Sequence, residues 1–506
     1  MAKQPNRNRR RRRPKASHSP AAPDSLSATP PRWTPLRNRV PSAAAIRAWF
    51  ARPRHLLLLG FVLVALLLRI PLALNCPQPW GYAYDEYHEG VAYLFYNGEL
   101  PPSEACWQCY HPPVFYVAGY PFYYAGVKYY LERYGPEVLQ ANPRAPAKFL
   151  NFLSFLAAMT TVVYACRILR LYRVQGMAFV WGVALLMVFP RLFISSWSAE
   201  ADIVLTAIMT ALLFYLLRYA MLPDPVPWRL PIVLGVLCGL AMATKYNGLA
   251  GLATAGAVTL ARGVRTRRFA RMFADGPVIL LICLLIGSWK YTDNIEKFGT
   301  PLFANGSAAQ GFSIDKEYRW DIYDFASFRY GDVLDSMGPD APPGQLTELP
   351  VYYSVWTSLH ALAWTDMGMF TVGGRHGAPW DMYPHRAMPL WPAAALLALA
   401  LLPNALALLG AGLTIHRRQT LPLLLLTVIT TLAYFQWVLS QTAWALKAKY
   451  ILFLLPVYLV YVLLAMRWIE RKAPKAVTRV LWGGLWAVVG LCYVYAYYFS
   501  TAQITE

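Results

Sequence analysis

Apolar segments long enough to cross a lipid bilayer recur along most of this chain, and they restrict it to one broad structural class. Stretches of 18 or more mostly apolar residues return between Leu56 and Ser500, and each can span a hydrocarbon layer about 30 Å thick. Hydrophobic residues make up 57% of the 506 residues and charged residues only 14%, whereas soluble domains contain about 25% charged residues. We therefore predict an all-α polytopic membrane protein.

The apolar pattern predicts eleven transmembrane helices. Lys and Arg concentrate in every second loop between them, which by the positive-inside rule places the N-terminus in the cytoplasm. The remaining loops then lie on the outer (periplasmic or luminal) face of the cell membrane. The eleven helices cover roughly residues 55–74, 147–169, 176–196, 202–221, 230–245, 247–262, 277–291, 389–413, 420–440, 447–467 and 480–500.

Two further apolar segments are better explained as helices lying in the outer membrane interface. Counting Val114–Leu131 as a span would move the arginine-rich loop at 262–271 to the outside and reverse the charge bias. Its tyrosines suit the headgroup level. Leu349–Phe370 has the same character, and we expect Trp356 and Trp364 to be its surface anchors.

Charge and apolar pattern together divide the chain into four parts. Residues 1–54 carry fourteen Lys/Arg and one acid, so this tail accounts for +13 of the net charge of +21. Its composition predicts a disordered basic cytoplasmic tail that is attracted to anionic membrane lipids, and no nucleic-acid-binding fold motif accompanies it. A membrane module at 55–291, including the first outer loop (75–146), an outer loop at 292–388 and C-terminal membrane helices at 389–506 follow.

Adjacent carboxylates stand directly after the first span, at Asp85 and Glu86, followed by His88 and Glu89. At a membrane boundary, desolvation and mutual repulsion favour the protonated state of one carboxylate of such a pair. A carboxylate poised in this way can take a proton from an acceptor hydroxyl. A hydrated loop with ordinary surface acids is the alternative, and a metal site at Asp85, Glu86 and His88 matches no familiar spacing.

The same outer loop contains Cys106, Cys109 and His111, the last followed by Pro112-Pro113. A disulfide between the two cysteines would stiffen the loop. Zinc binding is less favoured, because a closed structural site needs four ligands, and a redox site would need a thioredoxin-like context. The residue before a proline avoids the helical region, so His111 should lead into the interfacial helix in an extended conformation.

Further charged residues gather at the expected outer ends of other spans. Glu200 and Asp202 lie between spans three and four, where Asp202 could also be a simple helix cap. Lys245 ends span five, and Lys447 and Lys449 open span ten. Each lysine alone could be a snorkelling anchor. Together with the outer carboxylates, they suit an anionic lipid phosphate and a neutral nucleophile.

Taken in this order, the landmarks resemble the GT-C class of polyprenyl-phosphate-sugar-dependent glycosyltransferases, and most closely its branch of protein O-mannosyltransferases and lipid A aminoarabinose transferases. The likeness covers about residues 55–465, with Lys where that branch usually has Arg before the tyrosine of span ten. The soluble carbohydrate-binding insert of the mannosyltransferases is absent. The matching residues are Asp85-Glu86, His111-Pro112-Pro113, Asp202, Thr244-Lys245 and Lys449-Tyr450 with Pro456.

The resemblance implies a hexosyl- or pentosyltransferase that moves a sugar from a polyprenyl phosphate to a protein, lipid or glycan acceptor by one inverting displacement. Asp85 and Glu86 would be the catalytic residues: Asp85 would deprotonate the acceptor, and Glu86 or Asp202 would orient it. His111, Glu200 and Asp202 would orient the acceptor or the donor. The departing lipid phosphate would bind at the three outer lysines, Lys245, Lys447 and Lys449.

No nucleotide cofactor is required by this scheme, and no metal either, although the acidic residues could hold a divalent ion. A transporter or flippase for a lipid-linked sugar is an alternative, but it predicts ionisable residues at mid-membrane in broken helices. An inactive subunit of an envelope assembly is a third reading, and the intact Asp85-Glu86 pair argues against it.

Overall fold

The described part of the protein is helical throughout. The computed structural model describes residues 51–70, 87–106, 108–141, 143, 145–223, 225–302, 322–330, 354–365, 390–440 and 446–502, and these contain α- and 3-10 helices and no strand. All of them belong to one structural unit, Ser42–Glu506. The expected basic tail, through residue 50, and the Asp85-Glu86 pair lie outside the described residues.

Seven helical segments of the described chain are long and apolar enough to cross a membrane, which confirms an all-α fold rich in membrane-spanning helices. These segments contain α7 (Leu150–Leu171), α10 (Ala201–Met221), α13 (Phe269–Gly287), α19 (Leu390–Thr414), α20 (Leu421–Ser440), α21 (Leu455–Lys472) and α22 (Lys475–Ala502).

Four shorter or less apolar helices occupy the remaining expected spans. They are α2 (Pro53–Leu67), α8 (Gly176–Val188), α11 (Arg229–Met242) and α12 (Leu249–Thr266). Most described residues of each expected span are therefore helical, but crossing by all eleven stays a prediction. Span seven begins earlier than predicted, at Phe269, because its arginine-containing first turn continues the helix.

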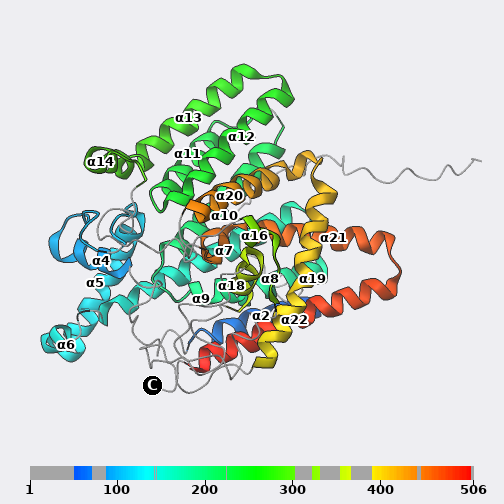
Figure 1. Cartoon of the computed structure of the whole chain (residues 1–506), viewed down its shortest axis with the longest axis horizontal. Coiled ribbons are helices and arrows are strands. Elements are labelled where there is room, and N and C mark those ends of the chain that lie inside the picture. The colour runs from blue at the N-terminus through cyan, green and yellow to red at the C-terminus, as the bar shows by residue number, and fades with distance from the viewer. Residues whose placement is uncertain are drawn as a thin grey trace, which may run out of the picture. The chain divides into compact units, whose positions relative to one another are not determined.

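Helix α10 lies at the centre of the fold (Figure 1). It is the most buried of the seven candidate spans, because 83% of its apolar 18-residue stretch lies inside the protein. It packs against α7, α11 and the 3-10 helix η8 (Ala448–Leu454). Segments that are 250 residues apart in sequence thereby meet near its N-terminal end. That end carries Glu200 and Asp202, and η8 carries Lys449.

The third expected span is broken in two by a proline. Helix α8 ends at Val188, and the short helix α9 (Pro190–Ser195) starts with Pro190. Phe189 adopts φ −54° and ψ 118°, because a residue that precedes proline is excluded from the helical region. The break turns the chain so that Arg191, in α9, is buried in the protein.

The described residues of the 75–146 loop form a layer of helices. Helix α4 (Tyr87–Asn97) packs on α5 (Val114–Tyr134), which also contacts the short α6 (Pro136–Ala141) and the 3-10 helix η1 (Ala145–Phe149). Phe115, Tyr116 and Tyr123 form the buried face of α5, whereas Tyr120 and Tyr124 are exposed. The helix expected at Val114–Leu131 is therefore present, and its place in the membrane interface stays a prediction.

The described residues between α13 and α19 include α14 (Trp289–Phe298), α16 (Ile322–Ala326) and α18 (Val355–Trp364). Helix α18 packs against α9, α19 and η8. Trp356 is 37% exposed, but Trp364 is buried against the edge of Phe189, with 4.9 Å between ring centroids. The expectation that Trp364 anchors the surface is therefore wrong, because this end of α18 is covered by the core.

Candidate functional site

Five charged side chains from four segments of the chain meet near the N-terminal end of α10. Arg191 comes from α9, Glu200 and Asp202 from the start of α10, Lys245 from the residue before the 3-10 helix η2 (Tyr246–Gly248), and Lys449 from η8. None is more than 6% exposed. Charged groups are rarely buried to this degree unless they are paired.

Both lysines pair with carboxylates of α10. The Lys245 Nζ atom donates to both carboxylate oxygens of Asp202, at 2.8 and 2.9 Å. The Lys449 Nζ atom donates to Glu200 Oε1 at 3.2 Å and lies 4.0 Å from Asp202 Oδ2. Neither acid caps its helix through a side-chain hydrogen bond at the cap position, so the simple-cap alternative for Asp202 is wrong.

Glu200 is held from its other side by α9. The Arg191 Nη2 atom lies 3.6 Å from Glu200 Oε1, and the Ser195 hydroxyl donates to Oε2 at 3.3 Å. The five ionised side chains carry three positive charges and two negative ones. The group therefore has one net positive charge in a buried position, where an anion would be attracted strongly.

Tyr450 connects the two lysines. Its ring centroid lies 4.3 Å from Lys245 Nζ and 5.9 Å from Lys449 Nζ, so the ring face faces both cations. The backbone carbonyl of Tyr450 accepts a hydrogen bond from Asn247 Nδ2 at 3.2 Å. This bond connects η8 to η2. It holds the backbones next to Lys245 and Lys449 together although the bonded residues are 203 positions apart in sequence.

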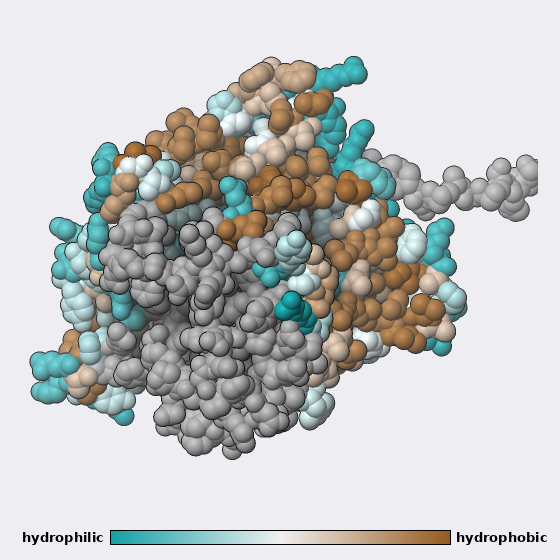
Figure 2. Space-filling view, in the orientation of Figure 1, coloured by the Kyte–Doolittle hydropathy of each residue, from teal (hydrophilic) through white to brown (hydrophobic). Residues whose placement is uncertain are grey.

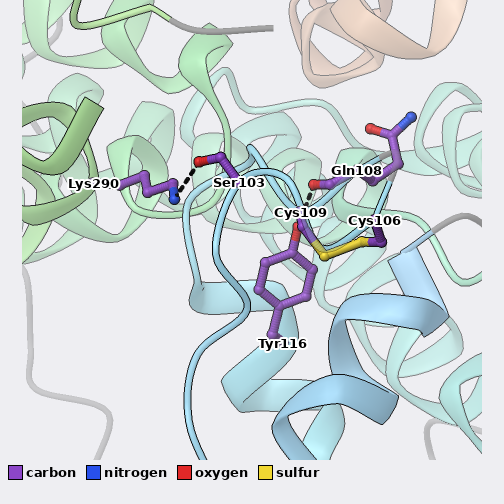
Figure 3. The surroundings of a disulfide bond; sticks show 6 residues. All are labelled: Ser103, Cys106, Gln108, Cys109, Tyr116 and Lys290. Carbon is purple, nitrogen blue, oxygen red and sulfur yellow. Dashed lines mark hydrogen bonds between the residues drawn. A yellow bond between two sulfur atoms is a disulfide. The ribbon is translucent and has the colours of Figure 1, made fainter. Parts of the chain in front are cut away.

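A disulfide closes the loop that precedes α5. Figure 3 shows the bond between Cys106 and Cys109, whose Cα atoms are 5.0 Å apart. The carbonyl of Gln108, inside this short ring, accepts hydrogen bonds from the Tyr116 hydroxyl and from the backbone N–H of His111. The zinc alternative for these cysteines is excluded in this state, because bonded sulfurs provide no thiolate ligands.

Three further hydrogen bonds attach this loop to the rest of the protein. The buried Lys290 of α14 donates to the Ser103 hydroxyl at 2.7 Å, as Figure 3 shows. The Tyr246 hydroxyl donates to the carbonyl of Tyr110 at 3.0 Å, and the N–H of Val114 donates to the carbonyl at the end of α11 at 2.9 Å. The loop is therefore attached to the segment that carries Lys245.

His111 lies at the end of this loop and is 5% exposed. Burial, together with the positive charges of Lys245 and Lys449, holds the pKa of His111 well below its ordinary value of 6.5. The imidazole is therefore neutral at physiological pH. It lies within the electrostatic field of the charged cluster. Its ring packs against that of Tyr110, with 4.1 Å between centroids and the two planes tilted by 39°.

The predicted site residues are thus partly brought together. Glu200, Asp202, Lys245 and Lys449 form one cluster with His111 near it, and burial of the lysines excludes the snorkelling alternative. Lys447 is placed differently: its side chain is half-exposed, and its backbone N–H donates to the Tyr434 hydroxyl at 2.9 Å.

Some predictions are not tested by this arrangement, and one residue was missed. Asp85 and Glu86 lie outside the described residues, and His88 is buried at the start of α4. Arg191 was not singled out by sequence reasoning. An arginine directly after a proline inside an otherwise apolar stretch was the available signal.

The described residues contain no group of three His, Cys, Asp or Glu side chains that could hold a metal ion. The two acids of the cluster, Glu200 and Asp202, already accept hydrogen bonds from Lys245, Lys449 and Ser195. The described part of the site therefore suits an anion better than a divalent cation.

The chain matches no protein-family model and no curated protein. Solved structures that are similar to it include the following two. ArnT from Cupriavidus metallidurans bound to undecaprenyl phosphate is 15% identical over 88% of this chain and 76% of that one, with a TM-score of 0.44. ArnT from the same organism in the apo state is 16% identical over 91% and 78%, with a TM-score of 0.40. At these values the likeness assigns neither a substrate nor a residue to this chain.

Proposed function

We propose that this protein is a membrane glycosyltransferase that moves a sugar from a polyprenyl-phosphate donor to an acceptor on the outer face of the membrane. The observation that carries the proposal is the buried cluster of Arg191, Lys245 and Lys449 around Glu200 and Asp202. The order of sequence motifs that resembles the GT-C class supports the same function.

Buried cations of this kind suit a phosphate that serves as a leaving group. The phosphate of a polyprenyl-phosphate sugar is charged before reaction, and it gains further negative charge as the glycosidic bond breaks. Fixed cations beside it stabilise the transition state more than the ground state. In this scheme Arg191, Lys245 and Lys449 provide the positive field, and Asp85 takes the proton of the acceptor.

The two carboxylates of α10 receive a role that differs from the one the motif likeness implies. Both oxygens of Asp202 accept hydrogen bonds from Lys245, and Glu200 contacts Lys449, Arg191 and Ser195. We assign them as positioning residues that fix the lysines before the donor binds. A site with preformed cation positions needs little rearrangement during the reaction.

The experiment that tests this function measures transfer of radiolabelled sugar by the purified full-length protein. A panel of polyprenyl-phosphate sugars serves as donors, and membrane, protein and glycan fractions serve as acceptors. We expect transfer by the wild type and loss of at least a hundredfold for Asp85→Asn and Lys449→Gln. The matched control is Lys297→Gln, because this exposed lysine pairs with Asp293 outside the cluster.

Transfer from one donor class by the wild type and by the control, but by neither site variant, supports the proposal. No transfer from any donor by a folded protein would contradict it. Such a result would favour the transporter or assembly-subunit alternatives instead.

A further inference from the structure

A second charged region lies at the opposite ends of the membrane helices, where α12 turns into α13. Residues 262–275 contain five arginines and one acid. Three of these arginines donate hydrogen bonds to backbone carbonyls. Arg262 donates to Tyr219, Arg265 to Ala220 at 2.9 Å, and Arg271 to Val226 at 2.8 Å. The turn itself contains Arg267 and Arg268, which are exposed.

The backbone at Arg267 is unusual for a residue with a side chain. Its φ of 54° and ψ of 27° are left-handed. The N–H of Arg268 bonds to the carbonyl of Gly263 and the N–H of Arg267 to that of Val264, which is the pattern of a Schellman helix end. Glycine is preferred at this position because a Cβ is strained there. An arginine is thus kept where it costs backbone energy.

The same feature occurs at the end of α7. Arg173 has φ 56°, and the N–H of Val174 bonds to the carbonyl of Leu169 in the same helix-ending pattern. Arg173 and Arg267 are the only non-glycine residues of the described chain with positive φ. Both are exposed, and both stand at helix ends that the charge pattern places on the cytoplasmic side.

The surface around Arg267 indicates what its side chain meets. Helix α13 is the least buried candidate span, because only 17% of its apolar 18-residue stretch lies inside the protein. Phe273, Leu281 and Leu285 are 69%, 60% and 76% exposed, and this apolar face needs a cover of acyl chains. Figure 2 shows apolar surface over α12 and α13, with hydrophilic residues at the end where the two helices join.

We propose that the α12–α13 turn binds anionic phospholipid, with the guanidinium of Arg267 on the headgroup phosphate and Phe269 and Phe273 beside the acyl chains. Lipid that covers α13 must place its headgroup near the helix end, where Arg267 and Arg268 are exposed. An arginine binds phosphate through two parallel hydrogen bonds, which glycine cannot provide. Arg173 is the equivalent contact at the end of α7.

The test uses the purified full-length protein in neutral detergent, with phosphatidylglycerol or phosphatidylcholine added in steps while thermal unfolding is followed. We expect phosphatidylglycerol to raise Tm at lower concentration than phosphatidylcholine does. Arg267→Gly should weaken the phosphatidylglycerol response about fivefold. Without lipid, its Tm should equal or exceed that of the wild type, because glycine relieves the left-handed strain.

Arg418→Gly is the matched control. Arg418 is an exposed arginine at another expected cytoplasmic turn, in the 3-10 helix η6 (Arg418–Thr420), and its backbone has no positive φ. If Arg267→Gly and Arg418→Gly weaken the phosphatidylglycerol response equally, the proposal is overturned, because the lipid would then be attracted by positive charge in general and not bound at the α12–α13 turn. A lower Tm of Arg267→Gly without lipid would also overturn it, since the arginine would then be kept for a contact within the protein.

Discussion

The two ends of the α10–α13 helix group both bury charged side chains, but they satisfy them in different ways. At the α12–α13 end, Arg262, Arg265 and Arg271 donate to backbone carbonyls near the end of α10. At the opposite end, Lys245 and Lys449 donate to the carboxylates of α10. The first arrangement mainly completes helix ends and fixes the fold, and it includes one ion pair, between Arg271 and Asp275. The second holds ionisable groups against one another, and a ligand can change their partners.

The first prediction breaks one carboxylate–lysine pair and has the largest expected effect. Asp202→Ala leaves the buried Lys245 without its carboxylate, so we expect a loss of about 3–5 kcal/mol in the free energy of unfolding, measured by thermal or denaturant unfolding. The double variant Asp202→Asn/Lys245→Gln removes both charges and retains a polar pair. It should recover most of the stability but none of the transfer activity.

Recovery of activity in that double variant would contradict the view that the charged cluster binds a ligand, because the two charges would then contribute to stability alone. Equal destabilisation of the single and double variants would contradict the predicted cause of the stability loss. The lost stability would then come from packing rather than from an unpaired charge.

The second prediction applies the same kind of change to the opposite end. Asp275 is 4% exposed, lies 2.9 Å from Arg271 Nε and accepts a hydrogen bond from the Tyr219 hydroxyl at 3.0 Å. Asp275→Asn should cost about 1.5–3 kcal/mol of unfolding free energy, because hydrogen bonds to a charged group are lost. Sugar transfer per folded molecule should remain at the wild-type level. A loss of transfer in folded protein would show that the two ends are coupled.

Sequence reasoning predicted the helices well because apolar length and loop charge are local properties. One predicted span is divided into α8 and α9 at Pro190, a residue whose effect on a helix the sequence alone indicates. Trp364 was misplaced because burial of α18 depends on which helices cover it. For the site, the charge of the loops predicted that four charged residues lie at the same membrane surface, namely Glu200, Asp202, Lys245 and Lys449. Their pairing follows from the packing of η8 and η2 on α10, which no local pattern encodes.

The third prediction concerns the disulfide that shapes the loop before α5. Replacing Cys106 and Cys109 by serine opens a very short ring, so we expect a loss of about 2 kcal/mol from the chain-entropy effect. Transfer should fall severalfold, since the loop that carries His111 is less well fixed. Reduction of the wild type should reproduce both changes and should leave the serine variant unaffected. An effect of the reductant on the serine variant would place the sensitive group elsewhere.

The fourth prediction uses His111 to measure the field of the cluster, and it has the smallest effect. The folded-state pKa is held well below 6.5 by burial and by the Lys245 and Lys449 charges. Below pH 6.5 the unfolded chain therefore binds a proton that the folded chain does not. Stability should be unaffected above that pH and should fall below it, by up to about 1.4 kcal/mol per pH unit. Thermal unfolding between pH 7.5 and about pH 5 measures this.

The control is His111→Gln, which keeps a polar neutral side chain and removes the titration. Its Tm should depend less on pH over this range than that of the wild type, whereas the two should differ little at pH 7.5. In the Lys449→Gln background one of the two lysine charges is absent while Asp202 keeps its pair with Lys245, so the pKa of His111 rises toward its ordinary value and the pH dependence becomes shallower. The same pH dependence in both backgrounds would mean that burial alone depresses this pKa, and that the cluster's positive charge does not extend to the loop.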